Sequence, residues 1–208
     1  MANFLIIGLG NKGEEYDNTR HNIGKEVLLH FAKAHEDSDW KEDKKLKAKV
    51  AKIKIDKNSA TLIIPEMFMN QSGLAIRSLS KAGGGVFKPE QVILIHDDMD
   101  LPLGSFKISF NRGSGGHRGV ESVSKVIKST EFTRVRIGVS PVTAKGLVKK
   151  PKGEDAVVTF ILGKFKPVEV ESLHKVSKWV GEALEMIISD AKQGREKAMG
   201  MYNTGVKK

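Results

Sequence analysis

The sequence predicts an α/β layer architecture with a mixed sheet. Short apolar segments of strand length recur along the chain, and amphipathic segments with apolar residues three or four positions apart separate them. Strands that alternate with helices are typical of this layered architecture. Some strand-like segments alternate polar with apolar residues, which favours a mixed sheet over a purely parallel one. The length of 208 residues favours one domain, residues 1–208, over two small ones.

The expected strands are of two kinds. One kind is nearly all apolar and should be buried, whereas the other alternates polar and apolar residues and should be half-exposed. In chain order, strands are expected at residues 4–8 (apolar), 47–55 (alternating), 60–65 (apolar), 92–96 (apolar), 106–110 (alternating) and 134–139.

The expected helices repeat apolar residues at helical spacing. The longest places Leu173, Val176 and Val180 on one face. In chain order, helices are expected at residues 23–34, 70–81 (ended by the glycine run 83–85), 117–128, 168–188 and 193–202. Residues 143–153 contain lysine, glycine and proline but few apolar residues, and are expected to form a loop.

Composition narrows the possible functions and compartments. The chain has no cysteine and therefore neither disulfides nor thiol chemistry, so a reducing compartment, the cytoplasm, is expected. No apolar run approaches the ~20 residues that cross a bilayer. The net charge of +10 favours a polyanionic partner, nucleic acid before an anionic membrane surface. Lysines gather in residues 41–54 and 145–166, although such segments can also form a solvated surface without a partner.

The loop after the first strand is the main candidate for a catalytic site. It contains His21, whose side chain can exchange a proton near neutral pH. α/β proteins place their chemistry at the carboxyl edge of the sheet, where this loop begins. Arg20 adds a positive charge beside the imidazole, and Asn22 could cap the following helix. We therefore expect His21 to be a general base, with Asn11 and Tyr16 nearby in the same loop.

A base needs a group that orients it, and the strand at residues 92–96 is followed by three aspartates. Asp97 is closest to the strand end, so it is a better candidate than Asp98 or Asp100 to hold one ring nitrogen of His21. The other nitrogen would then be free to deprotonate a water molecule. His96 and the three aspartates could instead bind a metal, but their spacing is not typical of a metal site, and none is expected.

Residues 8–13 match the G-x-G-x-x-G fingerprint of dinucleotide-binding proteins. That mechanism needs a helix to begin at the glycines, so that its amides meet a pyrophosphate. Here Glu14 and Glu15 follow the glycines, and the helical pattern begins only at Ile23. The fingerprint raises a nucleotide-dependent oxidoreductase as an alternative, but we expect no cofactor.

Two further segments carry polar groups suited to a substrate. Residues 65–73 could be a simple strand-to-helix turn, but Asn70 could also hydrogen-bond a substrate carbonyl or a water, with Met69 packed beneath the site. Residues 111–119 form a cationic, glycine-rich loop that enters a helix, which is chemistry suited to a phosphate or a sugar.

Together these motifs resemble the bacterial peptidyl-tRNA hydrolase family. The similarity runs along almost the whole chain, through LIIGLGNKGEEYDNTRHNIG, PEMFMNQSG, ILIHDDMDLPLG, GSGGHRG, RVRIGV and AMGMYN. The resemblance implies hydrolysis of the ester between a peptide and the 3′ ribose of tRNA, without metal or cofactor. It also implies a single α/β domain in which a mixed, twisted sheet is sandwiched between helices, with a C-terminal helix beside the cleft. We expect a monomer whose partner is peptidyl-tRNA.

Carried over residue by residue, the resemblance implies catalytic, substrate-binding and tRNA-binding roles. These are His21 as base and Asp97 as its partner; Asn11, Tyr16, Met69 and Asn70 around the peptide and water; and Lys107 with Arg134 or Arg136 at a tRNA phosphate. Arg118 stands where the family usually has asparagine, and could donate to a carbonyl or a phosphate of the substrate. Lys12 replaces a usual proline, and Ser140 with Pro141 replaces Gly-Arg. The main alternative is an RNA-binding relative without catalytic activity.

Overall fold

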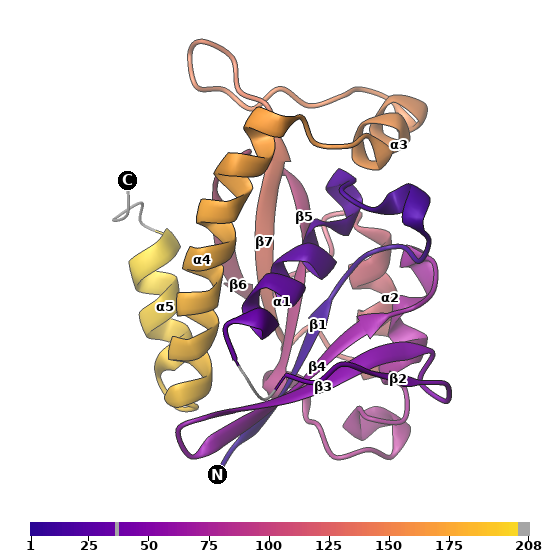
Figure 1. Ribbon diagram of the computed structural model, residues 1–208, viewed down its shortest axis with the longest axis vertical. Helices are drawn as coiled ribbons and strands as arrows, with labels where there is room; N and C mark the ends of the chain where they lie inside the picture. Colours follow the sequence, from indigo (N-terminus) through magenta and orange to yellow (C-terminus); the bar gives the residue numbers. More distant parts are fainter. Residues whose placement is uncertain (36–37, 204–208) are drawn as a thin grey trace.

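The computed structural model describes residues 1–35 and 38–203 and has the predicted α/β architecture (Figure 1). The strands are β1 (Asn3–Gly8), β2 (Lys41–Asp43), β3 (Ala48–Ile55), β4 (Asn58–Pro65), β5 (Val92–Pro102), β6 (Phe106–Phe110) and β7 (Thr133–Ser140). They form one sheet in the order β2-β3-β4-β1-β5-β7-β6. The central strands β4, β1, β5 and β7 are parallel, whereas β3 and β6 pair antiparallel with their neighbours, so the sheet is mixed as predicted.

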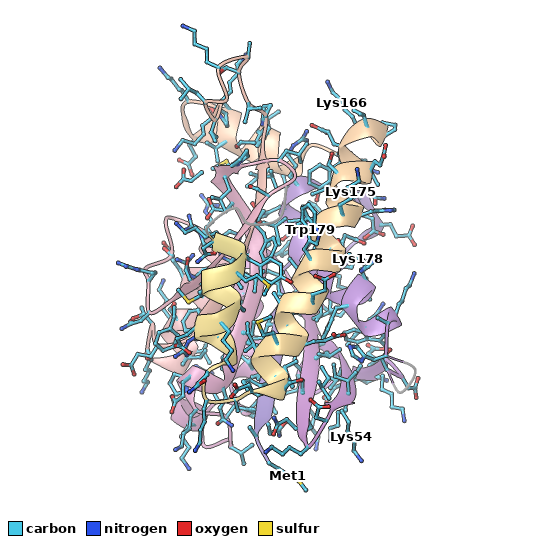
Figure 2. The ribbon with its side chains drawn as sticks, turned by 90° about the vertical axis from the view of Figure 1, so that its left-hand side faces the viewer. Met1, Lys54, Lys166, Lys175, Lys178 and Trp179 are labelled. Atoms are coloured by element: carbon cyan, nitrogen blue, oxygen red, sulfur yellow. The ribbon has the colours of Figure 1, made fainter. Side chains whose placement is uncertain are left out.

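Helices cover both faces of the sheet. On one face lie α1 (Ile23–Lys33), α4 (Pro167–Ser189) and α5 (Gly194–Asn203), and on the other lie α2 (Arg118–Ile127) and the 3₁₀ segment η3 (Met69–Ile76). The short helix α3 (Glu154–Leu162) contacts the 3₁₀ turn η2 (Arg20–Asn22). Figure 2 looks onto α4 and α5, with Lys166, Lys175 and Lys178 along α4. No helix in the described ranges combines the length and apolar character needed to cross a membrane.

The central strand β1 contributes to the core on both of its faces. Phe4 and Ile6 belong to the cluster under α1 and α4, while Leu5 and Ile7 belong to the cluster under α2 and η3. All four are buried, which explains why this strand reads as a continuous apolar run.

Most predicted elements form within one or two residues of their expected bounds, and the exceptions have structural causes. The α-helix predicted over 70–81 is wrong, because the segment is a 3₁₀ helix that ends at Ile76. Gly73 interrupts its apolar pattern and donates its N–H to Ser122 of α2. The strand predicted at 92–96 continues to Pro102, because it keeps pairing with β7 through Asp98. Two short elements, β2 and α3, were not predicted.

Candidate active site

The predicted residues come together at the sheet edge where β1 and β4 end, beside the middle of β5. His21 lies on η2 after β1, Asp97 lies within β5, and Asn70 lies at the start of η3 after β4. These strands are parallel neighbours, so their carboxyl ends meet at one edge of the sheet. Gly24 lets α1 begin directly against β5, since a Cβ atom there would lie 2.2 Å from the Ile95 carbonyl oxygen. The close approach places His21 beside Asp97.

Asp97 is the centre of a buried, hydrogen-bonded fork. Its Oδ1 atom lies 2.9 Å from Nδ1 of His21 and 2.8 Å from Nε2 of His117. The Asp97 side chain is only 4% exposed. His117, which the sequence reasoning did not assign to the site, is the N-cap residue of α2, and its Nδ1 accepts from the backbone N–H groups of Gly119 and Val120. A histidine at the end of a glycine-rich loop, directly before a helix, is the signal that could have revealed it.

The electrostatics of the fork define which atoms carry protons. Burial lowers the pKa of His21, but the charge and hydrogen bond of Asp97 outweigh it, so the net pKa is raised above its ordinary value. Burial would raise the pKa of Asp97, yet the two imidazoles hold it well below its usual range. Because the ionised carboxylate can only accept, Nδ1 of His21 carries its proton and Nε2 keeps a lone pair. This is the arrangement of an oriented general base.

Among the described residues, the side chains of His21, Asp97 and His117 form a group that could hold a metal ion by distance alone, because their ligand atoms lie within 4.8 Å of one another. A metal ligand must present a lone pair to the ion. In the fork, however, both ring nitrogens that face Asp97 donate to it, and His117 uses its other nitrogen at the start of α2. The acidic residues weighed as metal ligands separate, since Asp98 pairs with Arg136 and Asp100 with Lys150.

Asn11 is held in place by three hydrogen bonds. Its backbone N–H donates to Oδ1 of Asn22 at 2.7 Å, and the Asn22 amide donates back to the Asn11 carbonyl at 3.0 Å. Oδ1 of Asn11 accepts from the Met69 backbone N–H at 2.8 Å. The expectation that Asn22 caps α1 is therefore wrong, because its side chain clamps Asn11 and makes no cap hydrogen bond. This leaves the Nδ2 group of Asn11 as a donor, and both Asn11 and Asn70 line the cleft.

These side chains lie in a cleft of about 1000 Å³. Its wall includes most of the predicted site residues: Asn11, His21, Met69, Asn70, Asp97, Lys107, Arg118, Arg134 and Arg136. Tyr16 lies on the turn at residues 14–16, outside this lining. Apolar residues of α3, among them Val157 and Ile161, form another part of the wall, and α5 contributes Met199 and Asn203. The C-terminal helix thus lies beside the cleft.

Arg20 does not place its charge on His21, contrary to expectation. Its guanidinium instead donates to both carboxylate oxygens of Glu169, at 3.0 and 3.2 Å, and to the carbonyls of Gly163 and Lys164. These contacts tie η2 to the segment that joins α3 to α4.

Arg118 joins α2 to the other end of α3. Its Nη2 atom lies 2.7 Å from Oε1 of Glu154, and both side chains are exposed at the cleft, 64% and 75% respectively. An exposed pair of this kind is worth at most about 1 kcal/mol, so a phosphate or a carbonyl could compete for the guanidinium.

The other part of the cleft is basic. Its cationic lining residues are Lys107, Arg112, Arg134 and Arg136. Nε of Arg136 donates to Asp98 at 2.6 Å. Arg134 is buried with Nη1 3.3 Å from Nε2 of His96, and it has no carboxylate partner among the described residues. Burial and the nearby Arg136 lower the pKa of Arg134, so a bound anion would be favoured there. The two lysine-rich segments contribute no lysine to this lining.

A model of the peptidyl-tRNA hydrolase family matches residues 5–208. The chain belongs to this family. Among its relatives, peptidyl-tRNA hydrolase of Thermotoga petrophila is 36% identical over 200 residues, covering 96% of this chain and 97% of that protein. The enzyme of Aquifex aeolicus is 37% identical over 174 residues, covering 84% of each.

Solved structures of peptidyl-tRNA hydrolases share the fold. A complex with N-propanol superposes with a TM-score of 0.83 at 27% identity, covering 96% of this chain and 94% of that one. The enzyme of Acinetobacter baumannii gives 0.82 at 26% identity, with coverage of 96% and 95%. The predicted family, fold class and enzyme class, a hydrolase, are therefore confirmed.

Proposed function

We propose that this protein hydrolyses the ester bond between a peptide and the 3′ end of tRNA, with His21 as general base and Asp97 as the group that orients it. The observation that carries the proposal is the 2.9 Å contact between Nδ1 of His21 and Oδ1 of Asp97. The contact lies in a cleft that also presents the amides of Asn11 and Asn70. Membership of the family and a net charge of +10 support an RNA-linked substrate.

The proposed reaction needs one base and donors for a developing oxyanion. Nε2 of His21 takes a proton from water as the water oxygen attacks the ester carbonyl carbon, and negative charge develops on the carbonyl oxygen. The amides of Asn70 and Asn11 can donate to this oxygen. The intermediate then collapses: the bond to the ribose 3′ oxygen breaks, and that oxygen takes the proton back from Nε2. General-base assistance of this kind is typically worth about 10²–10⁴-fold in rate.

The basic part of the cleft is the proposed place for tRNA phosphate. Arg134 supplies a buried guanidinium without a carboxylate partner among the described residues, and Lys107 supplies an exposed ammonium nearby in the same cleft. Arg136 is held by Asp98 and so is fixed in direction. Phosphate contacts of this type set affinity in a salt-dependent way without specifying sequence. Arg118 is proposed to contact a carbonyl or phosphate of the substrate, and Met69 is proposed to shape the peptide site.

Turnover of a peptidyl-tRNA, followed as release of free tRNA, tests the proposal. His21→Ala should abolish turnover while RNA binding and the melting temperature stay close to those of the wild type. Substantial turnover in that variant would place the base elsewhere. Tight RNA binding by the wild type with no turnover would favour the RNA-binding relative without catalytic activity.

A further inference from the structure

His117 has two hydrogen-bonding duties, and together they determine where its proton lies. Nδ1 accepts from the N–H groups of Gly119 and Val120, at 3.1 and 3.3 Å, as the N-cap of α2. A proton on Nδ1 would point at these two donors and at the positive end of the helix dipole. The ring proton therefore belongs on Nε2, which lies 2.8 Å from Oδ1 of Asp97.

We propose that His117 is a positioning residue: α2 holds its imidazole in the Nε2–H tautomer, and that donor fixes the Asp97 oxygen that orients His21. The inference rests on the proposed function, because it assigns His117 to the machinery that prepares the base. His117 touches neither the water nor the ester in this mechanism, so it acts through Asp97.

Both donors of the fork use the same oxygen atom, which makes them compete. A carboxylate oxygen that accepts from His117 has less negative charge to offer His21, so the second donor tempers the rise in the His21 pKa. It also stops the carboxylate from rotating, because Oδ1 is held from two directions. His117 thus sets both the basicity of His21 and the direction of Nε2.

The other groups around the fork are already engaged. His96 of β5 donates from Nδ1 to the Asp97 backbone carbonyl at 2.7 Å, and its ring lies 4.7 Å from that of His117. Arg134 of β7 contacts His96, and Arg118 of α2 contacts Glu154 of α3. The Arg118 charge lowers the pKa of His21 after burial and Asp97 have acted, so Arg118 must stay constant in any test.

Two substitutions separate the cap from the donor. Asparagine is among the best N-cap residues, so His117→Asn keeps an acceptor for the α2 amides, but its side chain is too short to reach Asp97. His117→Gln can extend an amide N–H toward Asp97, but glutamine is not a favoured N-cap residue. A purely structural role predicts that only the cap matters. The positioning role predicts that only the donor matters for His21.

The readouts are the melting temperature, the titration of His21 followed by NMR, and the dependence of kcat on pH. For His117→Asn we expect a melting temperature near that of the wild type. The His21 pKa and the acid limb of kcat should move up by about 0.5 to 1 unit, a fraction of the strength of one charge-assisted hydrogen bond. For His117→Gln we expect a lower melting temperature with the titration close to that of the wild type.

The reverse pattern, an unchanged His21 titration in His117→Asn and a shifted one in His117→Gln, would overturn the positioning role. The NMR titration requires no turnover, so failure of the two proposals can be told apart. A wild type that does not cleave peptidyl-tRNA but shows the expected titrations removes the proposed reaction and keeps the role of His117. Normal turnover by the wild type, together with an unchanged His21 titration in His117→Asn, keeps the proposed reaction and removes the role of His117.

Discussion

Replacing Asp97 by asparagine separates the charge of this residue from its hydrogen bonds. The amide oxygen can still accept from His21 and His117, whose ring nitrogens lie 2.9 and 2.8 Å away, so the main loss is the negative charge. In the wild type, burial lowers the pKa of His21 and the Asp97 charge overcomes that effect. In Asp97→Asn burial is unopposed, so the His21 pKa should fall below its ordinary value of 6.5.

The expected size of the effect follows from the geometry of the pair. When His21 takes a proton from water, the new imidazolium and the Asp97 carboxylate attract each other. Two charges about 4 Å apart at an effective dielectric constant of ~20 attract by about 4 kcal/mol. Since about 1.4 kcal/mol is a factor of ten in rate, the upper limit is a loss of about 10³-fold in kcat. We expect a loss of about 10²–10³-fold, because the retained hydrogen bonds offset part of it.

Single-turnover cleavage of a peptidyl-tRNA across pH measures both consequences. The rate should fall, and the acid limb of the pH profile should move to lower pH. Asp98→Asn is the matched control, since the adjacent carboxylate pairs with Arg136 and does not touch either imidazole of the fork. That control should change KM and its salt dependence but leave the acid limb in place. An unchanged kcat in Asp97→Asn, or a limb that moves to higher pH, would refute the reasoning.

Further predictions concern pH, RNA affinity, stability and metal dependence. In the wild type, His21 must be unprotonated to act and its pKa is raised, so kcat should fall as pH drops through a midpoint above 6.5; a midpoint well below that value contradicts the assignment. Lys107→Ala should weaken RNA binding and reduce the slope of log K against log salt by about one unit, and an unchanged slope would place the phosphate elsewhere. Arg20→Ala leaves Glu169, 14% exposed, without its partner and should cost about 3–5 kcal/mol, or about 6–20 °C in melting temperature. Arg118→Ala, which breaks an exposed pair, should change the melting temperature little by comparison. Dialysis against a chelator should leave turnover intact, and a loss that added Zn²⁺ restores would argue for a metal at the fork.

The parts of the fold that the sequence predicts well are those in which a periodic pattern and the core agree. β1 is apolar from Phe4 to Ile7 because it is buried there on both faces, and α4 keeps its apolar stripe because that stripe packs against the core. α3 was missed because it has no buried residue: Val157, Val158, Ile161 and Leu162 line the cleft, so no core-facing pattern marks the helix. The segment at 70–81 has a helical apolar pattern, but the structure has a shorter 3₁₀ helix, η3, there. Its Gly73 contacts α2, and this tertiary contact is not visible in the local pattern.

For the candidate site, the ends of the expected strands predicted where polar side chains would gather. They did not predict which of these side chains would hydrogen-bond to one another. Asp97 was preferred to Asp98 because the strand was expected to end at His96, whereas β5 continues through both aspartates and the alternation of side chains along it separates them. Arg20 and Asn22 flank His21 in the sequence, yet Arg20 pairs with Glu169, far away in the chain, and Asn22 folds back onto Asn11 at the start of its own loop. His117 escaped for the same reason, since its contact with Asp97 exists only after α2 has docked beside β5.

One strand register supports both halves of the proposed function. Asp97 lies opposite Ile137 and Asp98 opposite Gly138 in the pairing of β5 with β7, and the register shifts directly after Asp98. Successive side chains of a strand point in opposite directions, so Asp97 reaches the imidazoles while Asp98 reaches Arg136. A slip of one residue would exchange the two carboxylates, and would break the His21–Asp97 contact and the Asp98–Arg136 ion pair together. Under the proposed function, β5 therefore positions both the base, through Asp97, and a phosphate contact, through the ion pair of Asp98 with Arg136 of β7. An anion that moves Arg136 would act on β5 through Asp98, the residue next to Asp97.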